Sequence, residues 1–117
     1  MEFLSMKNKD IQYVQKIIEY CDIADNLLDE YERDYLLFQS SQSFQLSTSM
    51  CIVQIGEYVS RLSDEFKEKH NNIPWKQIKG MRNFAAHQYE HFEFEVLWHT
   101  LTEELPELKE TLLPLIN

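Results

Sequence analysis

Apolar side chains recur along the chain at steps of three and four, the spacing that puts them on one face of an α-helix. The first stripe runs from Asp10 to about Tyr31, and charged residues fill the opposite side of that segment. A second stripe has near-heptad spacing and predicts a helix that packs lengthwise against a neighbour. Its positions are Phe44, Thr48, Ile52, Ile55, Val59, Leu62 and Phe66.

The residues between the stripes indicate where helices start and stop. Ser40 and Ser41 provide an N-cap region for the second helix, after a short apolar turn at 35–38. The polar residues 70–72 break that helix, and Pro74 suits the first turn of a third one. A fourth stripe begins near residues 92–95, and Pro106 inside it should kink or restart the helix. It contains Phe94, Leu97, Leu101, Leu105, Leu108, Leu112 and Leu115.

These elements predict an all-α fold, an up-and-down four-helix bundle formed by one domain over residues 1–117. The chain has only two glycines and three prolines, too few turn-forming residues for an all-β fold. The heptad-like second helix and several aromatic residues leave room for a homodimer. No apolar run is long enough to span a bilayer and no signal peptide precedes the first stripe, so we expect a soluble cytoplasmic protein without a membrane partner.

The charge is unevenly distributed along the chain. The net charge of −9 speaks against a general nucleic-acid binder. Residues 1–60 and 83–117 each carry a net −6, whereas residues 61–82 carry six basic and three acidic side chains, a net +3. A charge run of this kind is ordinarily a solvated helix surface. Its position is of interest because it leads directly into the most polar part of the third helix.

That part is residues 80–91, GMRNFAAHQYEH. Arg82 offers five N–H donors in a shape that fits phosphate oxygens, and His87 is the side chain suited to acid–base work near neutral pH. An arginine and a histidine, without metal ligands, are the minimum needed to cleave RNA through its own 2′-hydroxyl. On one helix they lie about 140° apart around the axis, so a groove or a second subunit has to bring them together.

Structural readings of the same residues stay open. Arg82 can form surface ion pairs with Glu90 or Glu93, and Tyr89 can be a rim aromatic with a hydrogen-bonded hydroxyl. A metal site is a further alternative, because His87, His91, Glu95 and His99 follow one another at steps of four. A helix break near residues 90–92 would destroy that row. The cysteines, Cys21 and Cys51, have no metal or disulfide spacing and read as small buried hydrophobic residues.

Gly56 interrupts the second stripe, where glycine costs about 1 kcal/mol relative to alanine. We expect another backbone or a bulky side chain to approach closely there. Its neighbour Glu57 reads either as a solvent-facing residue or as a support for the site.

The extended string IPWKQIKGMRNFAAHQY resembles the signature of HepT-like toxins, a minimal branch of the HEPN superfamily. The family pattern is Arg, any four residues, His, any one residue, Tyr, which here is Arg82, His87 and Tyr89, with the polar Asn83 after the arginine. Residues 55–57 (IGE) and 105–109 (LPELK) are similar as well, in order along the whole chain. Gln88 departs from the pattern, since many relatives have glycine there.

The resemblance implies an all-α homodimer in which Arg82 and His87 of both subunits form an endoribonuclease site that needs no metal or other cofactor. It implies RNA as substrate, with Asn83 and Glu57 as supporting residues. It also implies a partner, a minimal nucleotidyltransferase antitoxin that transfers AMP from ATP to Tyr89 and so blocks the cleft. The acidic residues Glu90, Glu93 and Glu95 argue against strong RNA affinity. The alternative is a non-catalytic helical subunit that binds substrate or nucleotide for a partner nucleotidyltransferase.

Overall fold

The computed structural model describes residues 2–91 and 93–116, with the side chains of 2–8, 84 and 86–91 outside the description. All its regular elements are helical, which confirms the all-α prediction for this part of the chain. The elements are α1 (Glu2–Glu30), α2 (Tyr35–Ser40), α3 (Gln42–Arg61), α4 (Asp64–Lys69), α5 (Trp75–His91), α6 (Phe94–His99), the π-helix η1 (Thr100–Glu104) and α7 (Leu105–Ile116).

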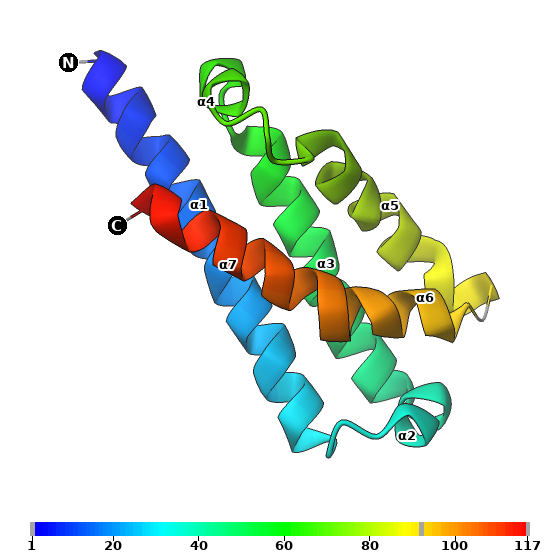
Figure 1. Ribbon diagram of the computed structural model, residues 1–117. Helices are drawn as coiled ribbons and strands as arrows, with labels where there is room; N and C mark the ends of the chain where they lie inside the picture. The colour runs from blue at the N-terminus through cyan, green and yellow to red at the C-terminus, as the bar shows by residue number, and fades with distance from the viewer. Residues whose placement is uncertain (1, 92, 117) are drawn as a thin grey trace.

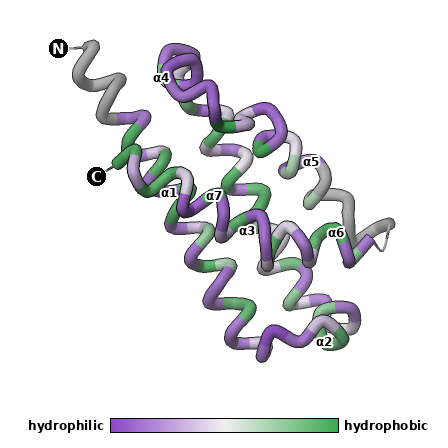
Figure 2. Tube along the Cα trace, in the orientation of Figure 1, coloured by the Kyte–Doolittle hydropathy of each residue, from purple (hydrophilic) through white to green (hydrophobic). Residues whose placement is uncertain are grey.

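Helix α3 occupies the centre of the arrangement. It packs against α1 on one side and α5 on the other, and the segment α6–η1–α7 crosses α1 and α3 obliquely (Figure 1). Hydrophobic and hydrophilic residues alternate along α1 and α3, as expected for helices with one buried face (Figure 2). The largest fully buried side chains come from α1, α2, α3 and the last crossing segment. They include Ile17, Leu28, Phe38, Phe44, Ile52, Ile55, Leu97, Leu101, Leu105 and Leu112.

The second long helix ends earlier than its stripe predicts. The stripe continues to Phe66, but α3 ends at Arg61, and both Leu62 and Ser63 have extended backbone. The Ser63 hydroxyl caps α4 by accepting a hydrogen bond from the Phe66 N–H. Asp10, buried on α1, accepts hydrogen bonds from the Ser63 N–H at 2.9 Å and from its hydroxyl at 2.7 Å. The prediction of a single helix up to Phe66 is therefore wrong. Ser63 caps a new helix and is held by Asp10 of α1, and these hydrogen bonds outweigh the apolar spacing that favours one continuous helix.

Other boundaries agree with the sequence. Ser41 caps α3 by accepting from the Phe44 N–H at 3.2 Å. Helix α5 begins at Trp75, directly after Pro74, and the Trp75 indole donates to the His70 carbonyl at 3.1 Å. Near Pro106 the regular α-helix restarts, as expected, because α7 begins at Leu105. The preceding turn widens into the π-helix η1, where the Leu105 N–H bonds to the Thr100 carbonyl five residues back. A widened turn relieves the clash that a proline ring makes with the carbonyl four residues earlier.

Both cysteines are buried in the core, as their positions predict. Burial raises the pKa of the Cys21 thiol from 9.0 to about 12 and that of Cys51 to about 11. The folded state holds these thiol protons more tightly than the unfolded state. The contribution of the two protonated thiols to the free energy of unfolding is therefore fully present below about pH 9, and it is lost as the pH rises through 11 and 12.

We expect the native thiols to react with a disulfide reagent at pH 8 at least about 100-fold more slowly than in guanidinium chloride, since the thiolate is the reactive form. The rate of thiol titration with and without denaturant measures this. Rapid reaction of either cysteine in the native protein would contradict their burial.

Candidate functional site

Helix α5 carries the three residues of the Arg–His–Tyr pattern. Its inner face is fixed by Trp75, Ile78 and Ala85, which are between 0 and 7% exposed. Arg82 follows Ile78 by one turn, and positions 87 and 89 lie on the same continuous helix. Position 89 is two turns beyond Arg82 on nearly the same side, whereas position 87 is about 140° away. The side chains of His87 and Tyr89 lie outside the described residues, so their predicted roles stay predictions.

Arg82 is held at the crossing of α5 and α3 by an ion pair. Its Nη1 donates to Glu57 Oε1 at 2.8 Å, and the two side chains are 29% and 40% exposed. Ion pairs with this exposure contribute about 0–1 kcal/mol to stability. The consequence of the contact is therefore orientation: it directs one edge of the guanidinium toward α3. The sequence allows Glu57 to be either a solvent-facing residue or a support for the site, and the structure gives it Arg82 as its partner.

Gly56 explains why Arg82 can lie so close to α3. A Cβ atom at Gly56 would stand 2.6 Å from the Arg82 Cβ and 3.3 Å from the Lys79 carbonyl oxygen. This confirms the expected close approach at Gly56. The stretch IGE thus combines two features on one turn: a glycine that admits α5, and a carboxylate that binds the arginine brought there.

The exposed residues around Arg82 on α5 are basic or neutral. Lys76, Lys79 and Asn83 are exposed, and the helix contains no acidic residue from Trp75 to Ala85. The three acidic residues within 61–82 all lie on α4 and not on α5. The sequence island of positive charge is therefore a real local excess on the first half of α5, next to Arg82.

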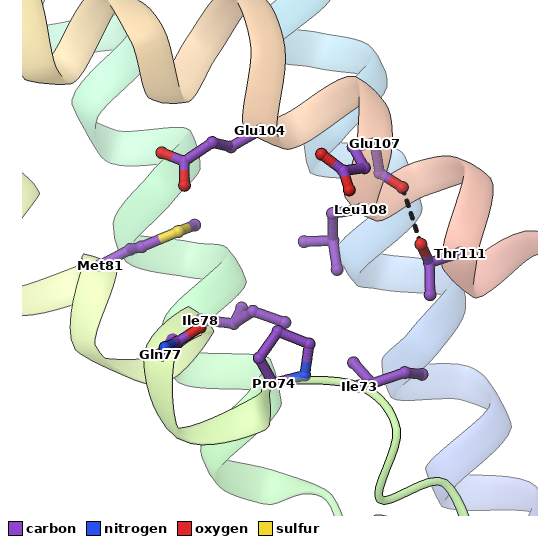
Figure 3. Close-up of a pocket in the computed structure, with 9 residues that line it drawn as sticks. All are labelled: Ile73, Pro74, Gln77, Ile78, Met81, Glu104, Glu107, Leu108 and Thr111. Carbon is purple, nitrogen blue, oxygen red and sulfur yellow. Dashed lines mark hydrogen bonds between the residues drawn. The ribbon is translucent and has the colours of Figure 1, made fainter.

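The other side of α5 has a different character. A cavity of about 450 Å³ lies between α5 and the η1–α7 segment, and sequence reasoning missed it (Figure 3). Its apolar part includes Ile78, Met81 and Leu108, and its acidic part is Glu104 and Glu107. The Thr100 hydroxyl donates to Glu104 at 2.8 Å across the π-helix. Carboxylates on this rim would repel RNA phosphates, and Arg82 does not line the cavity.

The row of possible metal ligands is not carried by one helix. His87 and His91 belong to α5, whereas Glu95 and His99 belong to α6, and Glu93 between the helices is not helical. Within the described residues no cluster of three or more His, Cys, Asp or Glu side chains could hold a metal ion. Separately, none of the described helices combines the length and apolarity that a bilayer crossing requires.

Comparison with known proteins gives consistent results. The profile of a family described as "Ribonuclease HepT-like" matches residues 12–115. A Caldanaerobacter subterraneus subsp. tengcongensis protein named "Putative RNase" is 31% identical over 83% of this chain and 85% of its own length. A Thermococcus cleftensis protein named "Probable ribonuclease HepT" is 30% identical over 89% of this chain and 93% of its own.

A Methanocaldococcus jannaschii protein, also named "Putative RNase", is 31% identical over 89% of this chain and 85% of its own length. No solved structure matches the chain at comparable significance. The profile covers nearly the whole chain, including α3 with Gly56 and Glu57 and all of α5. The chain belongs to the HepT-like ribonuclease family.

Proposed function

We propose that the protein is the toxin of a toxin–antitoxin pair, a metal-independent endoribonuclease whose site is built from Arg82 and His87. The observation that carries the proposal is Arg82: it is fixed by Glu57 over a glycine of α3, on a helix segment with only basic charge. Membership of the HepT-like ribonuclease family supports the same reaction class.

In the proposed reaction the 2′-hydroxyl oxygen of RNA attacks the adjacent phosphorus and the bond to the 5′-oxygen breaks. One imidazole takes the proton of the 2′-hydroxyl, and a second group gives a proton to the leaving 5′-oxygen. Arg82 stabilises the negative charge that grows on the phosphoryl oxygens. The products are a 2′,3′-cyclic phosphate and a 5′-hydroxyl, and no metal is required.

Two simultaneous proton transfers need two groups, and each chain contributes one His87. A homodimer of two HEPN-like four-helix bundles supplies both histidines in one cleft, and it also removes the difficulty that positions 82 and 87 lie about 140° apart on one helix. Asn83, exposed beside Arg82, would face the same cleft.

Silencing would occur at Tyr89, two turns along α5 from Arg82. In this step the Tyr89 hydroxyl oxygen attacks the α-phosphorus of ATP, pyrophosphate leaves, and the tyrosine loses its proton. A minimal nucleotidyltransferase antitoxin would catalyse the transfer. The added AMP brings a negative phosphate next to Arg82, where it competes with the RNA phosphate.

Growth after induced expression tests this proposal, using wild type, His87→Ala and Tyr89→Phe, each with and without a candidate nucleotidyltransferase. We expect wild type to arrest growth, His87→Ala to be harmless, and the partner to rescue wild type but not Tyr89→Phe. A mass increase of one AMP on rescued wild type would accompany this. Harmless wild type, with no RNA fragments, would sink the toxin proposal.

A second function is favoured by the net charge of −9 and by the acidic rim of the α5–α7 cavity. Both suit a protein partner better than RNA. In this alternative the chain is a non-catalytic subunit that binds substrate or nucleotide for a nucleotidyltransferase. Stable partner binding by wild type and by Arg82→Ala, with no RNA cleavage by either, would select it.

A further inference from the structure

Three tyrosines form a cluster where α1 packs against α3. The ring of Tyr58 on α3 lies 6.0 Å from that of Tyr13 and 6.1 Å from that of Tyr20, the latter pair stacked at 29°. All three are only partly buried. Three aromatic rings in contact at the edge of a helix pair form a rigid, flat-sided surface, because each ring limits the rotation of the next.

An arginine lies over one ring of this cluster, that of Tyr58. The guanidinium carbon of Arg61, the last residue of α3, lies 4.9 Å from the centre of the Tyr58 ring, within the range of a cation–π contact. The residue is exposed, so the guanidinium is available from the solvent side. A planar cation held over a tyrosine is a surface on which a nucleobase can stack.

A hollow of about 390 Å³ opens beside Tyr13, Tyr58 and Arg61. Its other residues are polar: Gln12, Gln15, Lys16 and Glu19. Glutamine amides can both donate to and accept from base edges. Lys16 is paired with Glu19 at 3.1 Å, so Arg61 supplies the net positive charge of the hollow. Aromatic rings, amides and one planar cation together suit a base better than an aliphatic side chain.

The position of the hollow relates it to the candidate site. Glu57 and Tyr58 are consecutive on α3, and they face different neighbours: Glu57 binds Arg82 of α5, while Tyr58 packs on α1. Side chains of consecutive helical residues point about 100° apart, and α3 lies between α1 and α5 (Figure 1), so the two features lie on neighbouring sides of the same turn of α3. A nucleic-acid strand with a phosphate at Arg82 can therefore reach Tyr58 and Arg61 within a few nucleotides.

We propose that Tyr58 and Arg61, with Tyr13 and Tyr20 behind them, form a stacking subsite for an unpaired base of the RNA substrate. The inference rests on the proposed ribonuclease function and deepens it, because it assigns single-stranded RNA as the substrate class. A duplex keeps its bases stacked inside and cannot offer one to this surface.

The test is equilibrium binding of a 5′-fluorescein-labelled single-stranded RNA to His87→Ala protein, which removes the proposed acid–base group and keeps the substrate intact. Arg61→Lys added to this background keeps the charge and loses the plane. We expect it to weaken binding by about 5–150-fold, the range for losing one stacked base, with the salt dependence unchanged. Tyr58→Leu should have an effect of similar size. Arg33→Lys is the matched control, because Arg33 is paired with Asp25 and Asp29. It should leave the affinity for the single-stranded RNA unchanged.

Equal affinity of the parent and Arg61→Lys would overturn the proposal, as would duplex RNA binding as tightly as the single strand, or no binding of the single strand by the parent. Because Arg61 is exposed, Arg61→Lys leaves the core unchanged, which a thermal melt verifies. Cleavage is scored separately. If wild type cleaves RNA and Arg61→Lys binds normally, only the stacking proposal fails. If Arg61→Lys weakens binding but wild type cleaves no RNA, only the ribonuclease proposal fails.

Discussion

Replacing Arg82 by alanine is expected to lower the rate of RNA cleavage by about 10²–10³-fold, the loss seen when one group that stabilises transition-state charge is removed. Arg82→Lys should recover part of the rate, because an ammonium retains the charge but lacks the planar set of donors. The fold should survive both changes. Arg82 and Glu57 are partly exposed, so losing their ion pair costs about 0–1 kcal/mol and leaves a carboxylate that water can solvate.

Lys79→Ala is the matched control for this prediction. Lys79 is an exposed cation one turn earlier on α5, so its removal changes the net charge by the same amount without touching Glu57. Single-turnover cleavage rates and thermal melts of the three variants make the comparison. If Lys79→Ala slowed cleavage as much as Arg82→Ala, Arg82 would act only through its long-range charge. If Arg82→Ala failed to fold, the arginine would be structural.

Gly56→Ala should destabilise the protein, by up to about 2 kcal/mol. The new Cβ would meet the Arg82 Cβ at 2.6 Å, and neither that atom nor the Lys79 carbonyl can move without shifting α5. Overpacking of this kind costs about 1–3 kcal/mol, which outweighs the roughly 1 kcal/mol that alanine gains within a helix. Because α5 has to move, RNA cleavage should fall as well.

Gly80→Ala is the opposite case on the neighbouring helix. A Cβ at Gly80 meets nothing within 4 Å, and the residue is exposed, so alanine should stabilise the fold by about 0.5–1 kcal/mol. Urea unfolding of wild type and both variants measures the difference. If Gly56→Ala were as stable as Gly80→Ala, the close crossing of α3 and α5 at Gly56 would be wrong.

The spacing of apolar residues predicts the helices correctly where one regular pattern of buried positions continues along the chain. The start of α5 after Pro74 and the apolar stripe from Leu97 to Leu112 are predicted because proline position and a 3.6-residue period are local properties. The end of α3 at Arg61 is missed because it depends on Asp10, more than fifty residues away, holding Ser63. The π-helix before Pro106 is missed because several distortions relieve a proline clash and only packing selects one.

The sequence identifies the residues of the candidate site, but it does not predict which of them contact each other. Arg82 and the resemblance around it are visible in the sequence, and Gly56 signalled a close approach. The pairing of Glu57 with Arg82 depends on the register between α3 and α5, which neither helix encodes alone. The tyrosine cluster with Arg61 was missed for the same reason, although Tyr13 and Tyr20 are spaced two turns apart on one face of α1.

Cleavage of a single-stranded RNA by purified wild type and His87→Ala protein in excess EDTA, with analysis of the product ends, tests the proposed metal-independent reaction of His87. We expect wild type to cleave without metal, leaving 2′,3′-cyclic phosphate and 5′-hydroxyl ends, and His87→Ala to be slower by about 10²–10⁴-fold. Cleavage that stops in EDTA, or that proceeds equally in both proteins, would contradict the proposed reaction.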